Sequence, residues 1–213
     1  MNEKVFVDQL VSAQNINSPA WLRSIQAEGK SQFEKLGFPT ERRGNEDWKY
    51  TDVSSLSKTN FNIAQHIEEN LKSDEQCRRL LLTNQDAYML CFTNGIFNKS
   101  FSVLPQEDSA IIAGPLSESA TKYVDFVKDS LGGIAEFSHN PFTALNTGFI
   151  REGAFLKIPP NTSIREPIYL QYIADAQESP IMSHPRNLIL VGRDSKATIV
   201  EIYIGVENCE YLT

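Results

Sequence analysis

The sequence predicts an α+β fold in which a helical N-terminal region is followed by strands alone. Amphipathic segments with helix start and stop signals recur over residues 1–150. From residue 151 onward, β-branched and aromatic runs alternate with Gly, Pro, Asn and Asp, which is typical of strands and turns. We therefore expect an N-terminal α+β domain over residues 1–150 and the start of a β domain over residues 151–213.

The composition indicates a soluble globular protein. The 213 residues are 41% hydrophobic and 22% charged, and no apolar run approaches the roughly 20 residues that span a bilayer. A net charge of −7 argues against a nucleic-acid or anionic-membrane surface. The first residues lack the apolar core of a secretion signal. We expect a cytoplasmic protein with no nucleic-acid or membrane partner.

Two helices are expected before residue 40. Apolar residues at helical spacing predict an amphipathic helix over residues 4–14. The second helix has Ser18 as its expected N-cap, Pro19 in its first turn and Gly37 as its stop signal. Its apolar face is expected to contain Leu22, Ile25, Gly29, Phe33 and Leu36.

Residues 40–113 have a mixed pattern. Residues 40–62 are polar and irregular, whereas Ser73 and Gln76 fit a capping box ahead of a short helix. Asn94 and Gly95 stand between two apolar runs and predict a hairpin with a type I′ turn. Residues 110–113 are expected to form one more short strand.

Two further helices should complete the N-terminal region. Apolar residues share one face of a predicted helix over residues 117–131, which Gly132 ends. Asn140 before Pro141 then begins a short helix that runs to about residue 149.

Strands are expected at residues 154–158, 168–173, 187–191 and 197–204. Without intervening helices, these residues alone permit a sandwich, a barrel or a β-solenoid. The spacing loosely suits a parallel β-helix, and a β-sandwich remains the alternative. Residues 206–213 resemble the beginning of another strand, so we expect the chain to be a piece of a longer protein.

The sequence contains no pattern typical of a catalytic or metal centre. No phosphate-binding glycine motif is present. The three cysteines (Cys77, Cys91 and Cys209) are isolated, whereas metal-binding thiolates usually occur in close pairs. The histidines (His66, His139 and His184) are dispersed and are interpreted as surface or capping residues. We expect no catalytic residue, no metal ligand and no cofactor bound by this chain.

Two polar–aromatic features remain as candidate anchors or interfaces. Trp48, Lys49 and Tyr50 place a cation between two large rings, an arrangement that can fasten a loop or bind a partner protein. Arg186 lies between Pro185 and an expected strand, where a structural hydrogen bond is the simplest role.

Three blocks of sequence, taken in order, resemble a known family. They are residues 46–51 (EDWKYT) after 37–40 (GFPT), residues 142–147 (FTALNT) continuing through 153–159 and 166–168, and residues 184–188 (HPRNL) with 197–203. The set resembles the N-terminal part of the SufD family, in the SufBCD system of iron–sulfur cluster assembly. The departure is length, because SufD-like proteins continue into further coils and a C-terminal helical domain.

The resemblance implies a right-handed parallel β-helix of which this chain holds only the first coils. It implies a non-catalytic scaffold with a SufB-like subunit and a SufC-like ATPase as partners, the latter through a C-terminal region not in this sequence. An iron–sulfur cluster would then occur only in the assembled complex, and a homodimer is a further expectation. A β-helix carbohydrate-active enzyme and a self-associating structural module are the alternatives.

Overall fold

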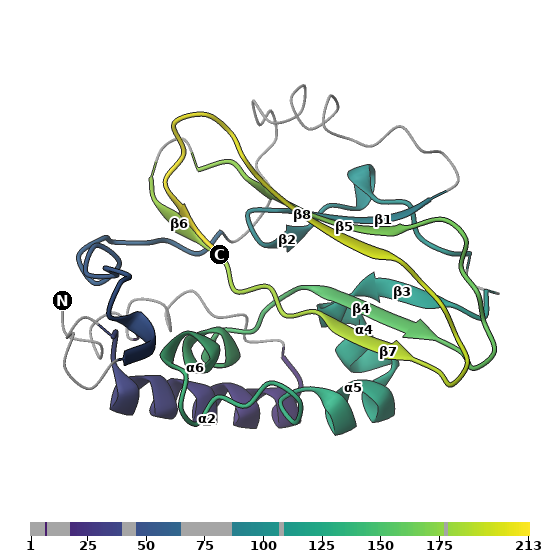
Figure 1. Ribbon diagram of the computed structural model, residues 1–213, viewed down its shortest axis with the longest axis horizontal. Helices are drawn as coiled ribbons and strands as arrows, with labels where there is room; N and C mark the ends of the chain where they lie inside the picture. The colour runs from purple at the N-terminus through teal and green to yellow at the C-terminus, as the bar shows by residue number, and fades with distance from the viewer. Residues whose placement is uncertain (1–6, 8–17, 40–45, 65–86, 107–108, 177–178) are drawn as a thin grey trace.

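The computed structural model describes residues 7, 18–39, 46–64, 87–106, 109–176 and 179–213. Helices form one side of the molecule and β-sheets the other (Figure 1). The mixed α+β class expected from the sequence is confirmed. The predicted helices at residues 4–14 and 73–81 lie outside the described residues, apart from the buried Val7. Cys77 and His66 lie outside them as well.

Helix α2 (Ala20–Leu36) follows the predicted punctuation closely. Pro19 occupies the N-cap position, so the expected cap at Ser18 is wrong by one residue. Gly37 ends the helix with a φ of 65°, and its N–H bonds to the Phe33 carbonyl. Gln26 is also buried on this face, and its Nε2 donates to the Ile150 carbonyl at 2.6 Å. A polar residue therefore belongs to a helix face that was predicted to be apolar.

Helix α6 (Pro141–Gly148) begins as predicted and packs directly on α2 (Figure 1). The Asn140 side chain accepts hydrogen bonds from the backbone N–H groups of Phe142 and Thr143. A Cβ added at Gly29 would lie 2.5 Å from the Gly148 backbone nitrogen. The two helices approach this closely only because glycine occupies the crossing point.

The helix predicted over residues 117–131 is two helices, α4 (Leu116–Lys122) and α5 (Val124–Ser130). Tyr123 separates them with non-helical angles of φ −126° and ψ 46°. Its ring stacks on Phe155 with the ring centroids 6.1 Å apart. The helix is thus interrupted at Tyr123, where the side chain packs against the sheet. Helical periodicity alone did not predict this interruption.

The predicted hairpin is confirmed. Strands β1 (Tyr88–Thr93) and β2 (Ile96–Phe97) pair antiparallel, and Asn94 and Gly95 have positive φ angles of 51° and 75°. Strand β3 (Ile112–Pro115) begins two residues later than expected and pairs antiparallel with β4 (Ala154–Ile158).

The remaining strands are β5 (Ile168–Ala174), β6 (Ile181–Met182), β7 (Leu188–Val191), β8 (Ile199–Gly205) and β9 (Tyr211–Leu212). They complete three sheets, with strand orders β2-β1-β5-β8, β3-β4-β7 and β6-β9. Within residues 151–213, every described strand pair is parallel: Phe155 pairs with Leu188, Ile168 with Ile199, and Ile181 with Tyr211. Paired residues are thus 30 to 33 positions apart, a register that does not fit an antiparallel sandwich.

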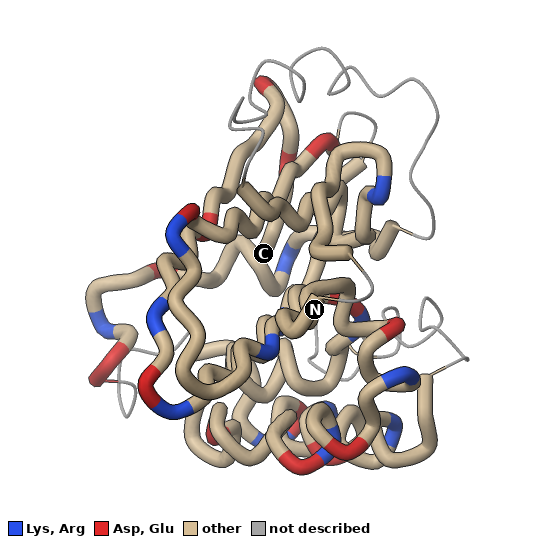
Figure 2. The backbone as a smooth tube through the Cα atoms, turned by 90° about the vertical axis from the view of Figure 1, so that its right-hand side faces the viewer, with Lys and Arg blue, Asp and Glu red and all other residues tan. Residues whose placement is uncertain are grey.

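Three apolar clusters hold these layers together. One lies between the two larger sheets and contains Leu90, Phe92, Leu156 and Leu170. A second joins the β3-β4-β7 sheet to α2, α4 and α5, and a third joins α2 to α6. Figure 2 shows acidic and basic residues interspersed along the helices at the bottom of the view. None of the helices within the described part of the chain is long and apolar enough to cross a membrane.

Candidate functional site

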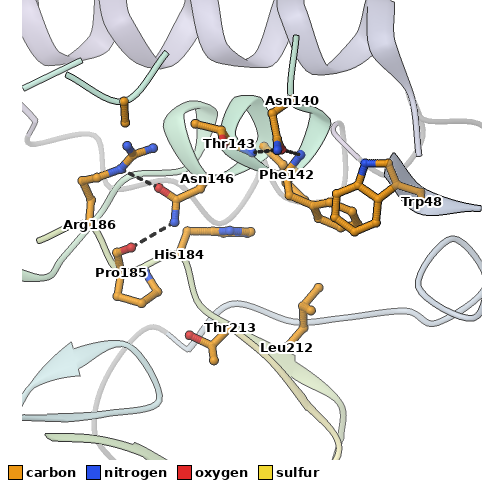
Figure 3. Close-up of a pocket in the computed structure, with 12 residues that line it drawn as sticks. Trp48, Asn140, Phe142, Thr143, Asn146, His184, Pro185, Arg186, Leu212 and Thr213 are labelled. Carbon is orange, nitrogen blue, oxygen red and sulfur yellow. Dashed lines mark hydrogen bonds between the residues drawn. The ribbon is translucent and has the colours of Figure 1, made fainter. Parts of the chain in front are cut away.

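A cavity of about 460 Å³ lies where several distant segments of the chain meet. Its walls come from the 3₁₀ helix η1 (Glu46–Trp48), from α6, from residues 184–186 and from β9 (Figure 3). The cavity brings together Trp48 and Arg186, two of the residues that the sequence marked as candidates. We treat it as the candidate functional site.

Trp48 forms an aromatic wall of the cavity. Its ring centroid lies 4.8 Å from that of Phe142 on α6, and Phe142 in turn lies 6.2 Å from the ring of Phe38. The polar segment around Trp48 is therefore fastened to the α2–α6 core through aromatic contacts.

Lys49 and Tyr50 lie outside the cavity, although they neighbour Trp48 in the sequence. The Tyr50 side chain is 91% exposed. Lys49 places its Nζ 5.0 Å from the centre of the Tyr50 ring and 3.3 Å from a Glu46 carboxylate oxygen. The structure thus separates the three candidates into one cavity residue and two surface residues.

Arg186 binds α6 by two charge-assisted hydrogen bonds. Its Nε donates to Asn146 Oδ1 at 2.8 Å and its Nη2 donates to Thr147 Oγ1 at 2.9 Å, while the Asn146 amide donates to the Pro185 carbonyl at 2.9 Å (Figure 3). The Arg186 backbone N–H donates to the Glu152 carbonyl at 3.0 Å. The side chain therefore joins the β region to helix α6.

The charge of Arg186 has no acidic partner in the described part of the chain, where no carboxylate lies within 4.0 Å of the guanidinium. Burial lowers the pKa of Arg186 from its ordinary value, because removing a cation from water disfavours its charged form. None of the described residues that line the cavity is acidic. Among the described residues, the cavity lining therefore contains one arginine and no acidic side chain.

His184 extends into the middle of the cavity (Figure 3). Its ring lies 5.6 Å from the Phe149 ring, and its Nε2 lies 3.2 Å from the Met182 sulfur. Burial lowers the pKa of His184 to about 4, so the imidazole is neutral at pH 7. His184 lies in a loop and is partly exposed, but its ring packs against Phe149 and Met182. Its position two residues before Arg186 was the signal that could have located it.

The described lining of the cavity contains no Cys, Ser, Asp, Glu or Lys. Elsewhere, Cys91 is a fully buried thiol in β1, and the Cys209 thiol is partly buried. Within the described residues, no three His, Cys, Asp or Glu side chains gather in a way that could hold a metal ion.

Two carboxylates of the β region, Glu152 and Glu201, accept hydrogen bonds from neighbouring elements. Glu152 accepts hydrogen bonds from the Ser117 hydroxyl and backbone N–H, and burial raises the pKa of its carboxyl. Glu201 accepts hydrogen bonds from Asn187 and Tyr203. These contacts connect secondary-structure elements to one another.

Comparison with known proteins identifies the family. The family described as SufBD protein N-terminal region matches residues 6–170. This chain belongs to the SufBD family. The SufD-like resemblance expected from the sequence is confirmed, and its EDWKYT and FTALNT blocks lie inside the matched range.

Curated relatives agree with this assignment. An iron–sulfur cluster assembly SufBD family protein of Synechocystis is 29% identical over 82% of this chain and 37% of its own length. The iron–sulfur cluster assembly protein SufD of Bacillus subtilis is 25% identical over 89% of this chain and 43% of its own length. A SufBD family protein of Arabidopsis thaliana is 27% identical over 46% of this chain and 25% of its own length. The chain therefore spans less than half the length of these relatives.

Proposed function

We propose that this chain is part of a SufD-like scaffold subunit that supports iron–sulfur cluster assembly in the cytoplasm and catalyses no step itself. The observation that carries the proposal is the family match over residues 6–170. The Synechocystis and Bacillus subtilis relatives are both named as iron–sulfur cluster assembly proteins. The cluster is the cargo of this process, bound only within the assembled complex and not by this chain alone.

The proposed framework is an N-terminal α+β domain over residues 1–150 and the first coils of a right-handed parallel β-helix over residues 151–213. The parallel pairs with their common spacing of 30 to 33 residues support this architecture, as does the known handedness of parallel crossovers. Aromatic rings of Phe92, Tyr172 and Tyr203 stack across three strands at 5.0 and 4.8 Å. This stack connects β1, β5 and β8 through their side chains.

The proposed partners are a SufB-like subunit and a SufC-like ATPase, the latter bound through a region outside this sequence. ATP-driven closure of the ATPase would move the SufB–SufD scaffold and open the site where the cluster is built. A homodimer of the scaffold subunit is a further possible assembly. The match to the SufBD family and the name of the Bacillus subtilis relative, an iron–sulfur cluster assembly protein, support this proposal.

Co-purification tests this function. The full-length gene product, tagged at one end, should retain the SufB-like and SufC-like proteins of its own organism under mild conditions, and the complex should accumulate a cluster when iron and sulfide are supplied. Light scattering on the isolated subunit would report a homodimer separately. If the tagged protein retains neither the SufB-like nor the SufC-like protein, the proposal is overturned.

A further inference from the structure

The cavity combines an aromatic wall with a cation that has no acidic partner among the described residues. Trp48 and Phe142 form the aromatic wall, and Arg186 supplies the cation, with His184 between them (Figure 3). Cavities of this volume, about 460 Å³, hold small organic ligands. The combination indicates a ligand that has a flat apolar part and a negative charge.

Arg186 retains the capacity to bind an anion. Two of its five N–H donors are used on Asn146 and Thr147, which leaves three without a partner among the described residues. The two bonds to α6 also fix the plane of the guanidinium, so little side-chain entropy is lost when a carboxylate binds. The chain has a net charge of −7, yet the described lining holds one arginine and no acid.

Helix α6 contacts both features. Trp48 contacts Phe142, and Arg186 is bonded to Asn146. Phe142 and Asn146 are four residues apart, which places them on one helix face about 6 Å apart along the axis. A ligand that reaches both Trp48 and Arg186 must therefore extend along the face of α6 that carries Phe142 and Asn146.

His184 determines the polarity of the space between the ring wall and the cation. Because its imidazole is neutral at pH 7 and packs against Phe149 and Met182, it adds no second charge. A neutral ring beside a single arginine favours a monoanion with an apolar body over a highly charged ligand such as a polyphosphate. We propose that this cavity binds an aromatic monocarboxylate whose ring packs on Trp48 and whose carboxylate pairs with Arg186.

Nuclear magnetic resonance gives a test with an internal control, because the chain has two tryptophans. Trp48 lines the cavity, whereas Trp21 lies on α2 and packs against a different core cluster. Indole-3-propionate is titrated into the ¹⁵N-labelled chain, and its neutral amide serves as the matched ligand. We expect the Trp48 indole N–H signal to shift to saturation while the Trp21 signal stays in place, and the carboxylate to bind at least fivefold more tightly than the amide.

Variants separate the charge from the ring contact. Arg186→Met should weaken binding of the carboxylate at least fivefold and change that of the amide less than twofold. Arg193→Met is the matched control: it removes one positive charge from an exposed turn and should change the affinity for neither the carboxylate nor the amide. If Arg186→Met fails to fold, Arg186→Lys takes its place and should retain a preference for the carboxylate.

Three outcomes would overturn this inference: no saturable shift of the Trp48 signal at millimolar ligand, equal affinities for the carboxylate and the amide, or equal shifts of both tryptophan signals. None of them would affect the proposed scaffold function, which is tested by co-purification.

Discussion

Asn187 connects three strands through one side chain, so its replacement is a demanding test of the β region. Its Oδ1 accepts hydrogen bonds from the Ala154 N–H, at 2.9 Å, and from the Tyr172 hydroxyl. Its Nδ2 donates to Glu201 at 3.1 Å. Ala154 is fully buried and Tyr172 is only 6% exposed. Water therefore cannot readily replace Asn187 as the acceptor for either donor.

The expected cost of Asn187→Ala follows from these two donors. A buried donor left without an acceptor costs about 1–3 kcal/mol, so two of them should lower the free energy of unfolding by about 2–6 kcal/mol. Tyr172→Phe alone should cost about 0.5–1.5 kcal/mol, because Asn187 keeps the Ala154 N–H as a partner. In the Asn187→Ala background, however, the same Tyr172→Phe change should be neutral or stabilising, since it removes an unsatisfied hydroxyl.

The parent protein, Asn187→Ala, Tyr172→Phe and the double variant form a double-mutant cycle. Urea unfolding of these four proteins, followed by circular dichroism, measures the coupling free energy between the two residues. The urea concentration at the unfolding midpoint should change between these proteins, while the slope of the free energy of unfolding against urea concentration stays constant. A coupling free energy of about 1 kcal/mol or more is expected for a direct hydrogen bond between buried groups. Additive effects, or a cost of Asn187→Ala below about 0.5 kcal/mol, would refute the reasoning, because the side chain would then not be the acceptor on which Tyr172 depends.

Two other predictions rest on residues near the cavity. Gly153→Ala should destabilise the protein by about 3 kcal/mol or abolish folding, because the new Cβ would lie 2.2 Å from the Arg186 carbonyl oxygen at a φ of 152°; a midpoint within error of the parent in urea unfolding would contradict this. Burial lowers the pKa of His184 from 6.5 to about 4, so the unfolded chain binds this proton more tightly and stability should be lost as the pH falls from about 6.5 towards 4. His184→Gln should flatten that part of the stability–pH curve, and an unchanged slope would exclude His184 as its cause.

Local signals in the sequence predicted local structure well. Gly37 ends α2, Asn140 caps α6, and Asn94-Gly95 forms the hairpin turn, all as expected. Each of these features depends on a few adjacent residues whose conformational preferences are strong. The break at Tyr123 was missed because it accompanies packing on Phe155, a residue 32 positions further along the chain.

Strand pairing could not be read from the sequence. The longer strands were predicted, although β6 was not. Their pairing was not predicted: β1 pairs with β5, and Tyr88 lies beside Ile168 although 80 residues separate them. The regular spacing of 30 to 33 residues later in the chain is not accompanied by a repeated motif. The cavity was beyond sequence reasoning for the same reason. Trp48 and Arg186 were each singled out, yet only the fold brings them to one place.

Residues 184–188 explain why the cavity and the sheets form one structure. On one side of this segment, Pro185 and Arg186 bond to α6 and help to shape the cavity. On the other side, Asn187 bonds to Ala154 and Tyr172, and Leu188 begins β7. Because consecutive residues serve both sides, the backbone here has little freedom, and Gly153 lets it lie directly against β4. A change that displaces this segment should therefore disturb the cavity and the strands together, whereas a change confined to the exposed Tyr50 should disturb neither.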